Sequence, residues 1–205
     1  MLPTFINRAN ISDSEMSSVE NNRNLFNALK WPLAAYGVLG GCYVGLIPGK
    51  WVWFSWHPLM MLVSFVTLAA NAALIKKIGG YDNTKMHGYM MTAAVTAACF
   101  AWYVIYSNKE MSGKAHLTSI HGKLGAVVML SYIGIGLFGL IALHPDFGFM
   151  RTNKTIRAVH KWAGRASTAA AWICCVLGFM TMKKDIAIQS VFAAPLLVCG
   201  FYVLL

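Results

Sequence analysis

The residues best suited to chemistry in this sequence are four histidines at or near the starts of four long apolar segments: His57, His87, His121 and His160. Ionisable groups are costly inside a membrane, so they tend to face the interior of a helix bundle and to serve a purpose there. Because consecutive spans run antiparallel, we expect His57 and His121 at one level of such a bundle. His87 and His160 are expected together at the other level.

Two facing imidazoles can fill both axial positions of a haem iron, which leaves no open site for oxygen and suits electron transfer. A structural zinc site would need four nitrogen or sulfur ligands at one level, and no cysteine or carboxylate joins either pair. Gly88, Gly122 and Gly164 lie beside the histidines and are expected to let a porphyrin approach closely. The alternative is four histidines that bond within the bundle or reach the membrane interface. Their two matching depths favour haem.

The elements that would position these histidines are transmembrane helices. The 205 residues are 58% apolar and 12% charged, and soluble domains carry about twice that charge. Backbone groups in lipid must bond internally, so each apolar span is expected to be a helix. The sequence predicts an all-α, polytopic membrane protein whose four-helix bundle core holds two haems. Its six spans run roughly over Leu29–Ile47, Ser55–Ile75, Lys85–Tyr106, Leu117–Leu143, Thr155–Met182 and Ile186–Leu205.

Residues 1–28 are polar and are expected to form a mostly disordered cytosolic tail without the apolar core of a cleaved signal peptide. A single membrane domain, residues 29–205, follows. Most of the 17 Lys and Arg residues fall on the side of the N-terminus. The positive-inside rule therefore places the N-terminus and the loops at 76–85 and 144–158 in the cytosol, and an even number of spans returns the C-terminus there.

The net charge of +10 is explained by this topology and by anionic lipid rather than by nucleic acid, because no arginine-rich run is present. The five cysteines all fall inside apolar spans without a CxxC pair. They are interpreted as packing residues.

The segments around the histidines resemble the cytochrome b561 family. The matching motifs are Ser55-Trp56-His57-Pro58, Lys85-Met86-His87-Gly88, Ile120-His121-Gly122 and His160-Lys161-Trp162-Ala163-Gly164. The resemblance covers about residues 30–205. The segment Gly113-Lys114-Ala115-His116-Leu117 resembles the subgroup of cytochrome b561 domain-containing proteins.

This resemblance implies a transmembrane oxidoreductase, commonly a homodimer, with two haems b per chain and no side-chain nucleophile. Cytosolic ascorbate would be the electron donor, and monodehydroascorbate or a ferric chelate the acceptor on the far side. His57 and His121 would hold the non-cytosolic haem, and His87 and His160 the cytosolic one. The subgroup favours an endomembrane, such as endoplasmic reticulum or vesicles, over the plasma membrane.

Basic residues beside the cytosolic haem are expected to bind the ascorbate anion. Lys77, Lys85 and Arg157 occupy the region that the family uses, and Asn83 could add a hydrogen bond. Lys76 is a weaker candidate, because only some of these side chains can face the haem.

Two histidines lie outside the proposed pairs. His116, in the outer loop five residues before His121, could bind oxidised ascorbate or a ferric ion, or pass a proton during the reduction. The alternative is a solvated loop histidine. His144 precedes Pro145 and is expected to cap the C-terminus of a helix.

Two other classes of function remain open at this point. A proton-coupled transporter could use intramembrane histidines as a relay, but it predicts broken helices in repeated halves, which the sequence does not show. A haem-binding sensor or assembly subunit predicts haem that ascorbate does not reduce rapidly.

Overall fold

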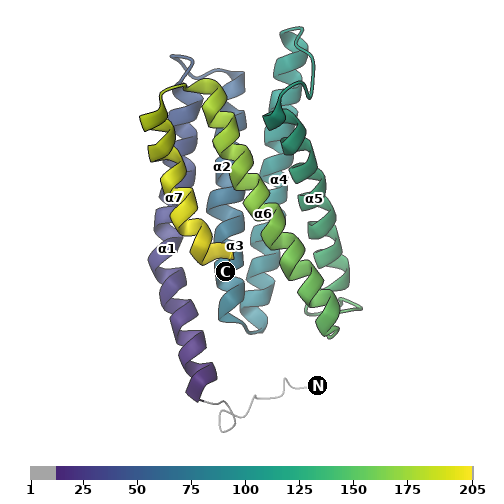
Figure 1. Cartoon of the computed structure of the whole chain (residues 1–205). Coiled ribbons are helices and arrows are strands. Elements are labelled where there is room, and N and C mark those ends of the chain that lie inside the picture. Colours follow the sequence, from purple (N-terminus) through teal and green to yellow (C-terminus); the bar gives the residue numbers. More distant parts are fainter. Residues whose placement is uncertain (1–12, 205) are drawn as a thin grey trace.

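Long helices make up most of the described chain, residues 13–204 of a computed structural model (Figure 1). In chain order they are α1 (Asp13–Leu46), the 3₁₀ turn η2 (Trp53–Ser55), α2 (Trp56–Leu62), the π-helical segment η3 (Val63–Ala69), α3 (Ala70–Ile78), α4 (Tyr81–Met111), α5 (Ile120–Ala142), α6 (Lys154–Met182) and α7 (Ile186–Leu204). The all-helical expectation is confirmed for these residues. Residues 1–12 of the expected tail, and Leu205, lie outside the described residues.

The rest of the expected tail is helical, which corrects the prediction of disorder there. Helix α1 begins at Asp13 and continues into the first apolar segment without a break. The side-chain amide of Asn22 donates to the backbone carbonyl of Lys77 at 3.0 Å. Polar composition predicted no packed core here. Continuity with a long helix and this contact with α3 supply the order instead.

Five stretches are long and apolar enough to cross a membrane: Trp53–Ile78, Tyr81–Met111, Ile120–Ala142, Lys154–Met182 and Ile186–Leu204. They coincide with the last five expected spans, so the chain is an integral membrane protein. The first expected span, Leu29–Ile47, lies in the second half of α1. Its four glycines and Lys30 lower its mean hydropathy, and a sixth span remains a prediction.

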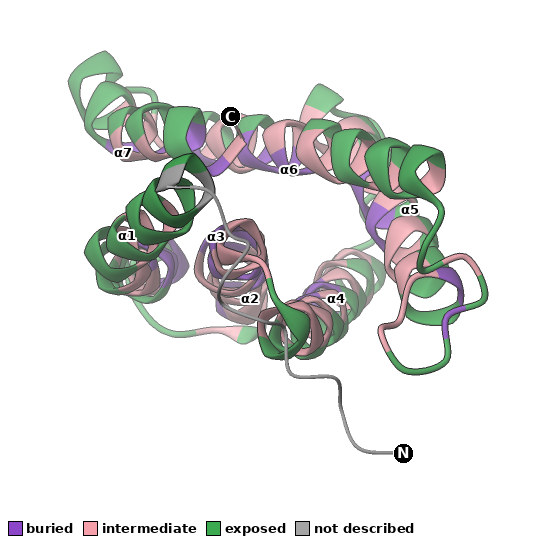
Figure 2. Ribbon diagram, turned by 90° about the horizontal axis from the view of Figure 1, so that it is seen from below, coloured by how far each residue is buried: buried purple, intermediate pink, exposed green. Residues whose placement is uncertain are grey.

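Successive helices alternate in direction along the bundle (Figure 1). The loops before α2 and α5 lie at one end of the bundle, and the loops before α4 and α6 lie at the end that carries the start of α1. Helix α6 runs obliquely across the others, and α6 and α7 lie on one side of the row formed by α1, α2 and α4 (Figure 2). This arrangement gives the two levels that the histidine positions require.

The turn before α2 is fixed by a buried serine. Ser55 is fully buried, its hydroxyl donates to the Gly45 carbonyl at 2.6 Å, and it accepts from the Val52 amide at 3.0 Å. Further along, η3 interrupts the α-helical hydrogen bonding between α2 and α3. Such π segments change the rotational register of a helix and often occur at functional sites.

Candidate cofactor-binding site

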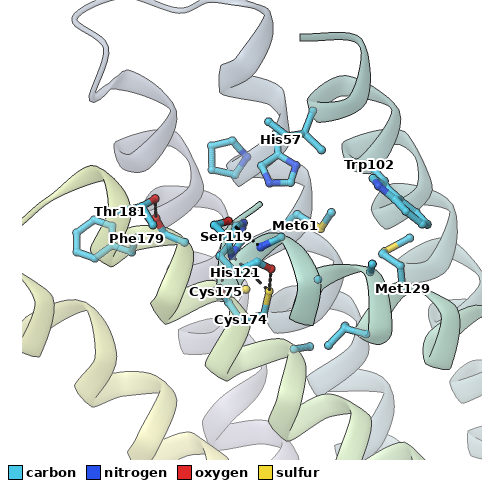
Figure 3. A pocket seen from close by; sticks show the side chains of 18 of the residues that line it. His57, Met61, Trp102, Ser119, His121, Met129, Cys174, Cys175, Phe179 and Thr181 are labelled. Atoms are coloured by element: carbon cyan, nitrogen blue, oxygen red, sulfur yellow. Dashed lines mark hydrogen bonds between the residues drawn. The ribbon is translucent and has the colours of Figure 1, made fainter. Parts of the chain in front are cut away.

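His57 and His121 face each other across the bundle at the end away from the start of α1. Their ring centroids are 6.3 Å apart and their planes are inclined by 81°. His57 lies in the first turn of α2. His121 lies in the first turn of α5, whose start is set by the Ser119 hydroxyl, which accepts from the Gly122 amide at 3.1 Å. Both rings line a cavity of about 300 Å³ (Figure 3).

Each of these rings is anchored through Nδ1. His57 Nδ1 lies 3.0 Å from the Ala101 carbonyl on α4, and His121 Nδ1 lies 3.0 Å from the Cys174 carbonyl on α6. A carbonyl only accepts, so Nδ1 must carry the proton and Nε2 keeps a free lone pair. Metal-binding histidines are held in this way, which fixes both the tautomer and the ring orientation.

The spacing of His57 and His121, called the outer pair from here on, fits a shared metal. Metal–imidazole bonds are about 2 Å long, and the ring centre lies about 1 Å behind the nitrogen, so a shared iron would hold two centroids about 6 Å apart. The observed 6.3 Å agrees with this distance. The walls are mostly apolar, as a porphyrin requires, and include Phe65, Trp102 and Met129. The residues present therefore fit a bis-histidine haem.

His87 on α4 and His160 on α6 form the second pair, called the inner pair from here on. His87 Nδ1 lies 2.9 Å from the Ala72 carbonyl on α3, the same anchoring as in the outer pair. His160 lies close enough to His87 for their charges to interact. Its Nδ1 is buried without a hydrogen-bond partner among the described residues. The anchored His87 ring keeps Nε2 for a ligand, and His160 lies near it, so this pair also fits a haem.

Two glycines that the sequence analysis did not select pack against histidine rings. A Cβ added at Gly178 on α6 would lie 2.8 Å from His121 Cε1, and one at Gly139 on α5 would lie 2.8 Å from His160 Cε1. Each ring therefore rests directly on the backbone of a facing helix. Gly88 and Gly164 meet nothing within 4 Å, and their expected role beside a porphyrin remains a prediction.

Lys76 lies near both His87 and His160. Its ammonium interacts electrostatically with His87 and with His160, and also with Arg157. Its Nζ donates to the Thr84 hydroxyl at 2.6 Å. The sequence ranked Lys76 below its neighbours because loop spacing alone did not show which lysine turns toward the histidines.

The other donor-side candidates do not all gather there. Lys77 Nζ donates to the Tyr202 carbonyl at the end of α7, 2.6 Å away. Lys85 forms an ion pair with Asp146 at 3.0 Å. The Asn83 amide donates to the Gly79 carbonyl at 2.6 Å. Arg157 is exposed near the start of α6.

The loop before α5 places His116 in the lining of the same cavity as His57 and His121, together with Lys109 and Tyr106. His116 Nε2 bonds to a Glu110 carboxylate oxygen at 2.6 Å, and its ring stacks on Tyr106 with centroids 4.6 Å apart. The next residue, Leu117, has φ +53°, a left-handed conformation unusual for a branched side chain. Strain of this kind often accompanies functional positions.

His144 is not a helix cap, which corrects the sequence-based expectation. Helix α5 ends at Ala142, and its terminal carbonyl at Gly139 accepts from the Leu143 amide. His144 Nδ1 instead accepts from the Asp146 amide at 3.2 Å, and its ring stacks on Phe147 with centroids 3.9 Å apart. It therefore organises the loop between α5 and α6.

Comparison with known proteins agrees with the motifs. The family model described as eukaryotic cytochrome b561 matches residues 56–184, a range that contains all four paired histidines. Transmembrane reductase CYB561D2 of Mus musculus is 29% identical over 127 residues, which cover 55% of this chain and 57% of that protein.

Two further relatives carry ascorbate in their names. Probable ascorbate-specific transmembrane electron transporter 2 of Oryza sativa subsp. japonica is 30% identical over 101 residues, covering 47% of this chain and 39% of the relative. Transmembrane ascorbate-dependent reductase CYB561 of Homo sapiens is 28% identical over 119 residues, covering 53% and 47%. The matched segments thus span between two fifths and three fifths of the curated relatives.

Proposed function

This chain belongs to the eukaryotic cytochrome b561 family, and from that premise we propose that it carries electrons across a membrane. The donor is cytosolic ascorbate, the carriers are two haems b, and the acceptor on the other side is monodehydroascorbate or a ferric chelate. The observation that supports this most directly is the pair His57 and His121, 6.3 Å apart between centroids. Both leave Nε2 free.

Four residues would hold the two groups. His57 and His121 would hold the non-cytosolic haem, and His87 and His160 would hold the cytosolic haem. A bound haem supplies an iron that accepts and releases one electron, and its potential depends on ligation, burial and nearby charge. The protein contributes anchored ligands, apolar walls and the exclusion of oxygen from the iron.

The donor site lies on the cytosolic face beside His87 and His160. Ascorbate is an anion at neutral pH, so lysine and arginine hydrogen bonds hold it. Lys76 interacts electrostatically with both of these histidines and with Arg157, so Lys76 and Arg157 are the leading candidates. Lys77, Lys85 and Asn83 surround them in sequence and remain candidate donor-binding residues.

The acceptor site lies at the mouth of the outer cavity. Lys109 interacts electrostatically with His121, and His116 lines the same cavity. A cation and an imidazole at this mouth suit an anionic acceptor that gains an electron and, in the case of monodehydroascorbate, a proton. His116 is held in place by Glu110 and Tyr106 for this contact.

The same proposal covers the arrangement in the membrane. It includes six spans with α1 as the first, both termini in the cytosol, an endomembrane location and a homodimer. The excess of Lys and Arg at the end that carries the start of α1 supports the orientation.

Reconstituted vesicles test the function. Ascorbate is sealed on the side of the protein that carries His87, and ferric citrate or monodehydroascorbate is supplied on the other. Wild-type protein is expected to reduce the acceptor, and a His57→Ala variant is expected not to. Haems that ascorbate does not reduce rapidly would favour the haem-binding sensor or assembly subunit, and haems that ascorbate reduces without any reduction of the acceptor would contradict the proposed acceptor. Protein that folds but contains no haem would favour the proton-coupled transporter.

A further inference from the structure

A single carboxylate is paired with a lysine on the cytosolic side of the described chain. Asp146, in the loop between α5 and α6, lies 3.0 Å from Lys85 Nζ. Its second carboxylate oxygen accepts from the Tyr81 hydroxyl. Lys85 also lies 5.2 Å from the centre of the Tyr81 ring. Lys85 lies near the start of α4, two residues before His87, and it is one of the proposed donor-binding residues.

The loop holds Asp146 in this position through its backbone as well. The Asp146 amide donates to His144 Nδ1 at 3.2 Å, and the Asp146 carbonyl accepts from Arg151 Nη1. The ends of the loop are tied together by the Met150 amide, which donates to the Ala142 carbonyl at 2.8 Å. The carboxylate is thus presented to α4 by an ordered loop rather than by a freely moving side chain.

We propose that Asp146 determines donor specificity by competing with an anionic donor for Lys85. The inference rests on the proposed function, because it takes the surroundings of Lys85 as the donor site. Ascorbate must displace the carboxylate from the lysine and must approach a fixed negative charge. An uncharged reductant, such as a hydroquinone, meets neither cost.

Asp146 is ionised under all ordinary conditions. The hydrogen bond from Tyr81, and after it the bond and charge of Lys85, hold the pKa of the Asp146 carboxyl below its usual range. Both partners are partly exposed, with 28% of the Lys85 side chain and 40% of the Asp146 side chain accessible. Solvent screening therefore limits the effect on affinity to roughly threefold to tenfold at low salt.

Asp82 provides a matched control. Asp82 lies in the first turn of α4, the helix that carries Lys85, and it has the same charge as Asp146. Within the described part of the chain no ion pair joins it to a lysine. Asp82→Asn and Asp146→Asn thus remove the same charge near the same helix end, but only the second releases Lys85.

The test measures ascorbate binding and donor rates on haem-loaded, full-length protein. Binding is measured by calorimetry under anaerobic conditions after the haems have been reduced with dithionite, so that no electron transfer contributes. Asp146→Asn is expected to lower the dissociation constant for ascorbate about threefold to tenfold, and Asp82→Asn to change it by less than about twofold. In stopped flow, Asp146→Asn should speed reduction by ascorbate and leave reduction by duroquinol unchanged.

A second pair of variants guards against loss of loop structure. In a Lys85→Gln background the gain from Asp146→Asn should fall to the size of the Asp82→Asn effect, because no lysine is left to release and only a fixed negative charge is removed. An unchanged or weaker ascorbate affinity in folded Asp146→Asn, or an equal gain for duroquinol, contradicts the inference while leaving the donor assignment intact. Wild-type protein that neither binds ascorbate nor accepts its electrons overturns the proposed donor and this inference together.

Discussion

The side chains of His57, His87 and His121 share one arrangement, in which Nδ1 donates to a backbone carbonyl of a neighbouring helix. Backbone carbonyls in a helix normally accept from the amide four residues later, so these acceptors are shared with a side chain. The arrangement leaves Nε2 of each ring free to accept a ligand. His160 differs, because its buried Nδ1 lacks such a partner.

Removing one ligand is expected to remove one haem. In His121→Ala the outer pair has a single imidazole, so the pyridine haemochrome assay should fall from two haems per chain to one, while the inner haem keeps its spectrum. His144→Ala is the control, since it removes a histidine that is bonded within a loop. Retention of two haems in His121→Ala would mean that His121 is not a ligand.

Acid should abolish the contribution of Asp146 to stability. Its pKa is lower in the folded chain than the unfolded value of about 3.9. The stabilisation is therefore complete above the unfolded pKa and is lost as the pH falls through the folded pKa. The difference in Tm between wild type and Asp146→Asn should be constant above about pH 5 and should shrink below about pH 4. A difference that grows toward acid would contradict this assignment.

At the scale of helices, the histidine levels could be predicted from sequence because a span length and an alternating direction suffice to define them. The roles of Gly139 and Gly178 could not be predicted, because each contacts a histidine ring on another helix. Residue spacing within one helix does not show which residues of another helix it will face. The pairing of Lys85 with Asp146 was hidden for a similar reason. It depends on how the loop after α5 folds back over α4.

The two glycines give a matched pair of helix-level predictions. Gly178→Ala should displace His121 and weaken the outer haem, and Gly139→Ala should displace His160 and weaken the inner one. Overpacking of this kind costs about 1–3 kcal/mol, which corresponds to a roughly fivefold to 150-fold loss of haem affinity.

Haem titration of the apoprotein, followed by spectroscopy of each haem, measures both effects. Gly134→Ala on α5 is the control, because a Cβ there meets nothing within 4 Å. Equal affinities in all three variants would show that the rings do not depend on these contacts.

The turn that presents His57 depends on Ser55. Ser55→Ala removes a donor to the Gly45 carbonyl and an acceptor for the Val52 amide in a fully buried position. Buried groups left unpaired cost about 1–3 kcal/mol. Denaturant unfolding in detergent should show that loss, and Ser18→Ala on an exposed turn of α1 should lie near wild type. A neutral Ser55→Ala would mean that the turn is held by other contacts.

For the molecule as a whole, composition alone predicted helices in a membrane, and five spans meet that expectation. Composition misjudged residues 13–28, because a polar segment that continues a long helix can be ordered by the helix it joins. The glycines of α1 allow close packing on η3, where a Cβ at Gly37 would lie 2.2 Å from the Thr67 hydroxyl. Close packing and high hydropathy make opposite demands on sequence, which is why this helix gives the weakest span signal.

We propose that four histidines on four helical segments would hold two haems. A haem-to-protein ratio, measured together with electron paramagnetic resonance of the oxidised protein, tests this proposal directly. Two haems b per chain, both low-spin and six-coordinate, are expected. Fewer than two haems, or a high-spin signal from an iron with an open position, would contradict the pairing of His57 with His121 and of His87 with His160.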